Sequence, residues 1–334
     1  MSKTHPDEWN IIINKFSYLP TPLKTQYLKL HETYGDGTAE AVFYESKYGM
    51  VYYSFLIRRI KNSRFVDITT PYGYGGPVFT GINHKNNLIL AFEFIKEFDK
   101  YCLDVGVVSE FIRYTPHLKN HIPLMENGFP VVKHCNNVVI DLKKNWEEIN
   151  KNIRYSYLSQ IRKNENLGKL KFSFASGNNA TKTFYELYSK NMEYKKIKGY
   201  FNFRKLYIEL LANKINNDIL ISQVKYQEKI INSAIFLLSR PYFIDYFLAA
   251  SAIDFKQAMG SHYLIYKTIE WAKNSGFIKM QLGGGHSSLI FFKSGFSKEV
   301  DEYFVSKIIR NTYEYERLVE LNSKRLNSTF PAYR

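Results

Sequence analysis

The strand-and-helix pattern of this chain runs through once, breaks, and begins again, and this restart constrains the fold more than any other feature. In the first half, apolar periodicity predicts an opening helix, strands, a Gly/Pro loop and a long helix, at residues 22–33, 39–45, 49–60, 65–79, 86–101, 105–114 and 137–142. Residues 145–168 are basic and helix-rich and end at Gly168. A strand, two helices, three antiparallel strands, a helix and a strand follow, at residues 169–176, 181–197, 203–215, 218–226, 229–240, 242–251, 257–275 and 277–285.

This order predicts an α/β (α+β) chain with two domains, each a mixed, mostly antiparallel sheet flanked by helices. We place the first domain at residues 1–150 and the second at 151–304, with residues 305–334 packing back on the first. The repeat is one of element order, without a repeat of residues. A chain of 334 residues is long enough for two such cores.

Composition narrows the class of protein. A content of 45% hydrophobic and 23% charged residues is typical of globular chains. No apolar run reaches the length of a membrane span, and the first ten residues carry no apolar signal segment. We therefore expect a cytoplasmic protein without membrane insertion. Cys102 and Cys135 form neither a disulfide framework nor a CxxC pair, and we expect no metal.

The formal net charge is +15, which favours anionic partners such as a phosphorylated cofactor, a nucleotide sugar, a tRNA or a membrane surface. The basic residues are dispersed, without a run of five or six, so a tRNA partner is less favoured than a small nucleotide. A biased genome rich in Lys and Asn codons is the alternative explanation of this charge.

Three segments carry a resemblance to a known family: TPYGYGGP (70–77), NIRYSYLSQIRKNENLG (152–168) and MQLGGGHSSLIFFKSGFS (280–297). Together they resemble the FemAB/FemX nonribosomal peptidyltransferases, which are built from two tandem acetyltransferase-like (GNAT) domains. The chain lacks a long coiled-coil arm, which leaves the compact FemX type and the nucleotide-sugar N-acyltransferases. Of these two it looks most like the nucleotide-sugar N-acyltransferase branch. The resemblance implies transfer of an acyl group from an activated donor to an amine.

Our first hypothesis is N-acylation of a nucleotide-linked amino sugar with acyl-CoA as co-substrate, serving synthesis of a surface polysaccharide such as O-antigen or capsule. One alternative is an aminoacyl-tRNA-dependent FemX-type peptidyltransferase of peptidoglycan bridges. A third is a non-catalytic phosphate-ligand-binding protein with a GNAT core.

Three residues are candidates for catalysis. Lys293, in the FFK run, stands where the resemblance places a lysine facing the reaction, and its alternative is a solvated lysine. Asp245 lies among apolar strand residues and is a candidate base, or a structural hydrogen-bonding residue. His286 is a candidate base or acceptor-binding residue in a predicted polar loop, or incidental.

The glycine run Gly283, Gly284 and Gly285, with Ser287 after it, predicts a backbone cradle for the phosphates or oxyanion of the acyl donor, or else a flexible turn.

Five residues are candidates for substrate binding. Tyr72 and Tyr74 of the Gly-rich loop can stack on a base or sugar, with Asp67 just upstream, or they simply pack a turn. Arg154 and Arg162 are predicted to lie on one face of a helix, where they could bind a diphosphate or face solvent.

Overall fold

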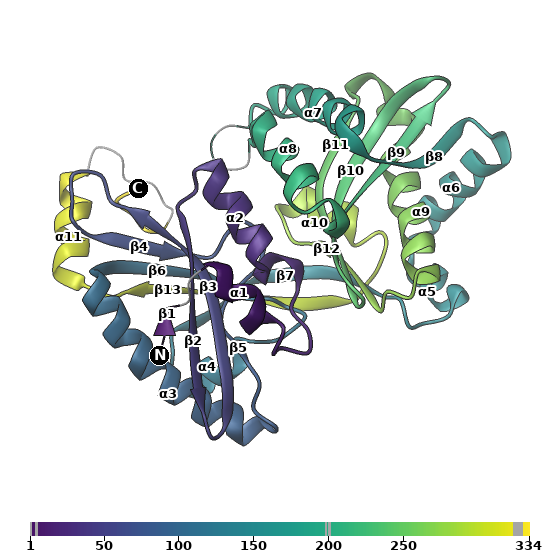
Figure 1. Cartoon of the computed structure of the whole chain (residues 1–334). Helices are drawn as coiled ribbons and strands as arrows, with labels where there is room; N and C mark the ends of the chain where they lie inside the picture. Colours follow the sequence, from purple (N-terminus) through teal and green to yellow (C-terminus); the bar gives the residue numbers. More distant parts are fainter. Residues whose placement is uncertain (1, 4–5, 198, 200–201, 323–329) are drawn as a thin grey trace. The chain divides into compact units, whose positions relative to one another are not determined.

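The computed structural model describes residues 2–3, 6–197, 199, 202–322 and 330–334 (Figure 1). The chain divides into two units. Unit 1 consists of Met1–Cys135 with Glu302–Arg334, and unit 2 consists of Asn136–Asp301. Each unit has its own set of paired strands and its own buried apolar side chains.

The sheet of unit 1 has the strand order β1-β2-β3-β4-β6-β13, with β5 paired to β3. Neighbouring strands among its described residues are antiparallel except β4 with β6, which the long helix α3 connects. The elements are β1 (Ser2–Lys3), α1 (Pro6–Ile13), η1 (Thr21–Leu23), α2 (Thr25–Tyr34), β2 (Thr38–Ser46), β3 (Gly49–Arg59), β4 (Val66–Thr69), β5 (Val78–Phe79), α3 (His84–Val105), β6 (Val107–Arg113), α4 (Ile122–Glu126), β13 (Val300–Ile309) and α11 (Thr312–Leu321).

The sheet of unit 2 has the strand order β7-β12-β11-β10-β9-β8. Here too one pair is parallel, β11 with β12, and α9 connects its two strands. The elements are β7 (Val131–Asp141), α5 (Trp146–Asn152), α6 (Tyr155–Leu167), β8 (Leu170–Ala175), α7 (Gly177–Tyr194), α8 (Lys205–Lys214), η3 (Asn216–Asp218), β9 (Ile219–Tyr226), β10 (Lys229–Ser239), β11 (Phe243–Ser251), η4 (Ile253–Ala258), α9 (Gly260–Asn274), β12 (Lys279–Gly283) and α10 (Ser287–Lys293).

The two halves of the chain follow the same course. A strand, two helices, three antiparallel strands, a crossover helix, a parallel strand, a short helix and a last strand occur in both. The last strand is exchanged: β7 of the first half pairs with β12, and β13 of the second half pairs with β6. The chain therefore passes from one unit to the other within β7 and again within β13.

The crossover helices form because their apolar residues recur at helical spacing. In α3, Leu90, Phe94, Phe98 and Cys102 follow one another at intervals of four and are all buried against the sheet of unit 1. The helix ends at Gly106, whose φ of +76° is one that glycine adopts without strain. In α9, Leu264, Ile265, Ile269 and Ala272 are buried in the core of unit 2 in the same way.

The predicted fold class, mostly antiparallel sheets flanked by helices, is confirmed. Residues 145–168 are rich in helix, as predicted, and form two helices, because Ile153 and Arg154 have non-helical backbone between α5 and α6. One local prediction is wrong. The residues after Gly285 form helix α10 where we expected a polar loop.

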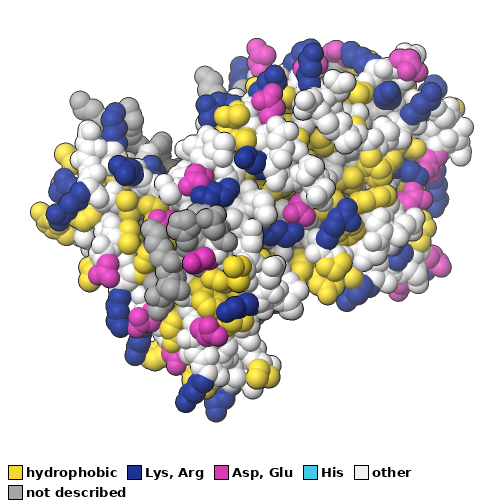
Figure 2. Space-filling model, viewed as in Figure 1, with side chains coloured by type: hydrophobic (Ala, Val, Ile, Leu, Met, Phe, Trp, Pro, Cys, Tyr) yellow, Lys and Arg dark blue, Asp and Glu magenta, His cyan; other side chains and the backbone are white. Residues whose placement is uncertain are grey.

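Charged side chains are interspersed on the face drawn in Figure 2, where Lys and Arg alternate with Asp and Glu. The excess of positive charge is therefore spread over this face.

Candidate functional site

In unit 2 the parallel strands β11 and β12 stop pairing before either strand ends. Their register begins at Phe243 with Lys279 and ends at Asp245 with Gln281. Strand β11 continues to Ser251 alongside β10, and β12 continues to Gly283 alongside β7. The two strands therefore separate at their carboxyl ends, which is the edge where open α/β sheets bind ligands.

Gln281 occupies the last paired position, and its side-chain amide is buried without a hydrogen-bond partner. The residue is 1% exposed, and neither Nε2 nor Oε1 has a partner in the described part of the chain. Met280 and Leu282 on either side lie in the core, so the Gln281 side chain faces the other side of the sheet. An unsatisfied buried polar group costs about 1–3 kcal/mol, and such groups call for a specific explanation. Sequence reasoning missed this residue, because the lack of a partner is a property of the folded chain.

Asp245, the candidate base, is the strand partner of Gln281 and is also buried. Residues opposite each other in neighbouring strands direct their side chains to the same face. The carboxylate and the Gln281 amide therefore share one face at the opening. The role of Asp245 as a base stays a prediction.

Lys293 is a buried cation, not a solvated surface lysine. It is the last residue of α10 and only 7% exposed. Its Nζ donates a hydrogen bond of 2.6 Å to the carbonyl oxygen of Gly284. A Cβ on Gly283 would stand 3.5 Å from this Nζ, and Gly283 itself has a φ of +77°. The glycine run thus places backbone beside the ammonium at the end of β12.

His286 and Ser287 begin helix α10 and are exposed. The His286 Nδ1 lies 3.0 Å from the Ser288 Oγ. Gly285 has a φ of +144° and lies against the Leu289 side chain. These residues are next to Lys293 in the fold, so the structure brings together the candidates of the C-terminal motif.

We predicted that Arg154 and Arg162 lie on one face of a helix. This prediction is wrong, because Arg154 precedes α6 as its N-cap. Its backbone N–H donates to the Gly295 carbonyl oxygen at 2.8 Å, and its Nη2 donates to the Phe291 carbonyl oxygen at 3.2 Å. The guanidinium also stacks over the rings of Tyr157 and Phe291. Arg154 therefore joins the start of α6 to α10, beside Lys293.

His262, near the start of α9, belongs to the same cluster and was not singled out from the sequence. Its ring lies edge to face with Tyr157 at 4.2 Å and with Phe292 at 5.0 Å between centroids. Burial, together with the nearby Arg154 charge, lowers the pKa of His262 to about 4. The imidazole is therefore neutral at physiological pH, and its Nδ1 has no partner among the described residues.

A stripe along the exposed side of α6 adjoins Arg154. It lines a shallow hollow of about 440 Å³. The stripe consists of Tyr155, Ser159, Arg162, Lys163, Asn166 and Leu167. Tyr155 is 82% exposed, and Phe291, which contacts the Arg154 guanidinium, is 65% exposed. We call the six residues of α6 from Tyr155 to Leu167 that line this hollow the α6 stripe; Phe291 is not one of them.

The corresponding parallel pair of unit 1 is closed. Beyond the end of β4, the Thr70 N–H donates to the Phe111 carbonyl oxygen at 3.1 Å, and the Gly75 N–H donates to the Arg113 carbonyl oxygen at 2.7 Å. Gly75 also forms a parallel bridge with Tyr114. The loop TPYGYGGP therefore fills the place that lies open in unit 2.

Tyr72 and Tyr74 lie in this loop, both half-buried. The Tyr72 carbonyl oxygen accepts a hydrogen bond of 2.6 Å from the Tyr27 hydroxyl, and the Tyr74 ring packs edge to face on Tyr303. Asn120 holds the loop through the Gly75 and Pro77 carbonyl oxygens. These contacts support the role of a packed turn.

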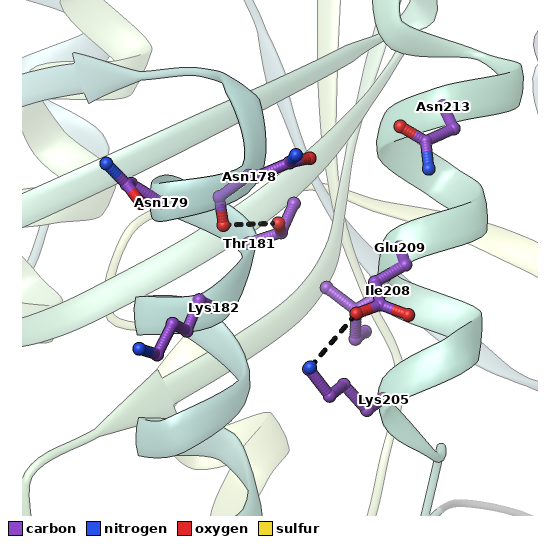
Figure 3. Close-up of a pocket in the computed structure, with 8 residues that line it drawn as sticks. All are labelled: Asn178, Asn179, Thr181, Lys182, Lys205, Ile208, Glu209 and Asn213. Carbon is purple, nitrogen blue, oxygen red and sulfur yellow. Dashed lines mark hydrogen bonds and ion pairs between the residues drawn. The ribbon is translucent and has the colours of Figure 1, made fainter.

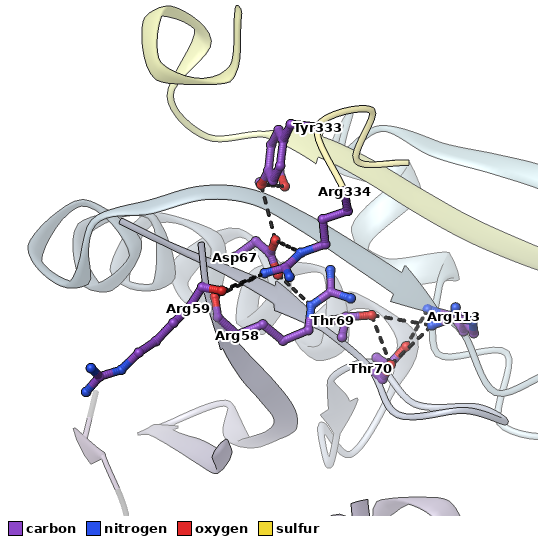
Figure 4. A network of polar contacts seen from close by, with 9 residues as sticks. Arg58, Arg59, Asp67, Thr69, Thr70, Arg113, Tyr333 and Arg334 are labelled. Atoms are coloured by element: carbon purple, nitrogen blue, oxygen red, sulfur yellow. Dashed lines mark hydrogen bonds and ion pairs between the residues drawn. The ribbon is translucent and has the colours of Figure 1, made fainter. Parts of the chain in front are cut away.

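Asp67 is fully buried in a network of ion pairs in unit 1 (Figure 4). Its carboxylate oxygens accept from the Arg58 Nε at 2.6 Å and from the Arg334 Nε at 2.5 Å. The Tyr333 hydroxyl donates to the same carboxylate at 3.3 Å. The network fastens the C-terminal residues to β3 and β4, which supports a structural role for Asp67.

Helices α7 and α8 line another hollow, of about 330 Å³ (Figure 3). Its polar walls include the Lys205–Glu209 ion pair, with the lysine Nζ 3.2 Å from the carboxylate. None of the residues singled out from the sequence lines it. The lining residues are Asn178, Asn179, Thr181, Lys182, Lys205, Ile208, Glu209 and Asn213.

The described residues contain no group of three or more His, Cys, Asp or Glu side chains that could hold a metal ion. In the same part of the chain, no helix combines the length and the apolar character that crossing a bilayer requires.

Comparison with known proteins identifies the domain of unit 2. Residues 151–294 match the family model described as an acetyltransferase (GNAT) domain. No curated protein sequence matches the chain. Residues 151–294 are therefore similar to a GNAT domain, and the candidate site lies at the open parallel pair within this segment.

Solved structures resemble the chain over nearly its whole length. A crystal structure of FemX has a TM-score of 0.68 at 13% identity, covering 94% of this chain and 99% of that one. The C-terminal domain of a putative lysylphosphatidylglycerol synthetase from Agrobacterium fabrum has a TM-score of 0.59 at 12% identity, covering 96% of each chain. A conserved protein of unknown function from Bacteroides thetaiotaomicron has a TM-score of 0.58 at 11% identity, covering 91% and 98%. At these identities the likeness establishes the fold alone.

Proposed function

We propose that this protein is an N-acyltransferase whose acyl donor binds unit 2 at the opening between β11 and β12. The observation that carries the proposal is the buried Lys293 ammonium at the carboxyl end of an open parallel pair. In the reaction, the nitrogen of a neutral amine attacks the donor's carbonyl carbon. A C–N bond forms, the bond from that carbon to the donor oxygen or sulfur breaks, and the leaving group takes up a proton as the amine loses one.

The side chains at the opening suit these steps. The negative charge that develops on the carbonyl oxygen is stabilised by the Lys293 ammonium, which acts most strongly in a site that excludes water. The Asp245 carboxylate, on the face that Gln281 shares, accepts the proton of the attacking amine. Unit 1 offers no such opening, because the TPYGYGGP loop closes its parallel pair.

For the donor, we favour an aminoacyl-tRNA. The α6 stripe presents an exposed aromatic ring beside Arg162 and Lys163, and single-stranded nucleic acid binds to such combinations of stacking surface and cations. The whole-length likeness to FemX supports the same donor. The acceptor is then the amine of a diphosphate-linked cell-wall precursor, as the family resemblance implies.

A second candidate is acyl transfer from acyl-CoA to a nucleotide-linked amino sugar. It is supported by the family model of residues 151–294, whose description is that of an acetyltransferase. None of the likenesses above points to a nucleotide sugar, so this candidate comes second.

The test is a transfer assay with the full chain and two labelled donors, alanyl-tRNA and acetyl-CoA. The acceptor panel contains UDP-linked muropeptides and nucleotide-linked amino sugars, and products are identified by mass spectrometry. We expect label transfer from alanyl-tRNA that ribonuclease abolishes. Thiol release with an amino sugar would replace our first candidate by the second. Absence of transfer from both donors would overturn the proposed function.

A further inference from the structure

The Gln281 amide lacks partners at a position where a ligand can supply them. Both of its polar atoms are buried and without a hydrogen bond among the described residues, so it has a donor and an acceptor to offer. It stands at the last rung of the β11–β12 ladder, where the strands begin to separate. The amide therefore lies at the point from which the two strands diverge.

The position of Gln281 relative to Lys293 indicates which part of a substrate it reaches. The Lys293 Nζ lies next to Gly283, two residues beyond Gln281 on the same strand. Two residues of a strand span about 6.6 Å. Gln281 and Lys293 are therefore close enough for one acyl group to contact both, although β12 has a register irregularity between Gln281 and Gly283.

We propose that Gln281 determines the acyl specificity of this enzyme by hydrogen-bonding a polar substituent, an amino or hydroxyl group, on the carbon next to the reacting carbonyl. The inference rests on the proposed function but not on the carrier of the acyl group. An unsubstituted acyl group would leave the buried amide without partners in the complex as well. A site built to bind an N–H or O–H group rejects the analogue that lacks it far more strongly than an apolar pocket rejects an added group.

Unit 2 offers a matched control. Gln223 of β9 is also a buried glutamine, and its Nε2 also lacks a partner among the described residues. It pairs with Ser233 and Ser173, away from the β11–β12 ladder. Substitution of Gln223 therefore reproduces the loss of a buried amide without touching the opening.

The experiment measures kcat/KM with three acyl groups that differ in one substituent: alanyl, lactyl and propionyl. Each is supplied on tRNA, and lactyl and propionyl are also supplied on CoA, with the acceptor found in the transfer assay. We expect the wild type to prefer alanyl or lactyl over propionyl on the order of 100-fold or more. Gln281→Leu should reduce this preference to a few-fold, while Gln223→Leu retains it.

Thermal unfolding distinguishes recognition from a structural role. Removing an unsatisfied amide should leave the melting temperature of Gln281→Leu equal to or above that of the wild type, and Gln281→Met should behave alike. Marked destabilisation of both variants would show that the amide is bonded inside the protein, and would overturn the inference. Unchanged acyl preference in a stable Gln281→Leu variant would also overturn it, while leaving the proposed function intact. Failure of the wild type to transfer any of the three groups from either carrier would reject the proposed function itself.

Discussion

At the scale of single residues, Lys293 is the side chain on which the proposed chemistry depends most directly. We predict that Lys293→Met lowers kcat by about a hundred- to a thousand-fold, or about 2.7–4 kcal/mol, with little change in KM. The reason is that the ammonium would act on charge that exists only in the transition state. Steady-state kinetics on a variant with a wild-type circular dichroism spectrum provide the test.

Two other outcomes of this substitution have distinct meanings. A raised KM with kcat preserved would assign Lys293 to ground-state binding of a phosphate. Wild-type values of both constants would remove Lys293 from the site, and the transfer of the family's C-terminal motif to this chain would fail with it.

The lowered pKa of His262 leads us to predict that the free energy of unfolding depends on pH. Its pKa is about 4 in the folded protein, mainly because of burial, against 6.5 for the ordinary side chain. The unfolded chain therefore binds a proton more readily, so this contribution is fully present above pH 6.5 and is lost as the pH falls toward 4. The loss amounts to at most about 3 kcal/mol.

The measurement is urea unfolding at pH 7 and pH 4.5 for the wild type and His262→Gln. We expect the wild type to lose more unfolding free energy than the variant between these two pH values. Equal losses would show that the His262 proton does not distinguish the folded from the unfolded chain.

At the scale of secondary-structure elements, the α6 stripe predicts how the donor binds. Arg162→Ala combined with Lys163→Ala should weaken binding of alanyl-tRNA and reduce the slope of log affinity against log salt by about 1 to 2, because two phosphate contacts are removed. Lys190→Ala with Lys214→Ala, on exposed positions of α7 and α8, is the matched control. Filter binding at several salt concentrations measures both. Equal effects of the two double variants would exclude a specific role of the stripe.

Elements were predictable from sequence where one periodicity dominates. The alternation in residues 49–60 and the four-residue spacing in 86–101 correspond to β3 and α3 within a few residues. Helix α10 was not predictable, because its first residues follow a glycine run and have the composition of a loop. The break before α6 was not predictable either, since Arg154 continues a helical pattern in sequence but caps the helix in the structure.

The candidate site could be predicted from the sequence only in part, for a related reason. The C-terminal motif indicated Lys293 and the glycines, which are close in sequence. Gln281 and His262 became visible only through burial and missing partners, which depend on residues from other elements. Asp67 shows the reverse, since a carboxylate beside a Gly-rich loop suggested a ligand site, whereas the fold surrounds it with arginines.

At the scale of the whole molecule, the Asp67 network distinguishes a structural from a functional carboxylate. Asp67→Asn should lower the unfolding free energy by about 3–5 kcal/mol, because it leaves two arginines around a site without a compensating charge. Chemical denaturation measures this loss. The KM values of the variant should remain unchanged below its melting temperature. A stable variant with raised KM would instead place Asp67 in contact with a substrate.

The exchanged last strands also bear on how the chain reaches its native state as it leaves the ribosome. Strand β6 lies about two hundred residues before β13, its antiparallel partner, and the contact joins Arg113 to Val305. The sheet of unit 1 therefore has an open edge at β6 throughout the synthesis of unit 2. An unpaired strand edge is a template for association with other chains. Nascent chains halted before residue 300 should accordingly depend on chaperones, or aggregate through β6, more than the finished protein does.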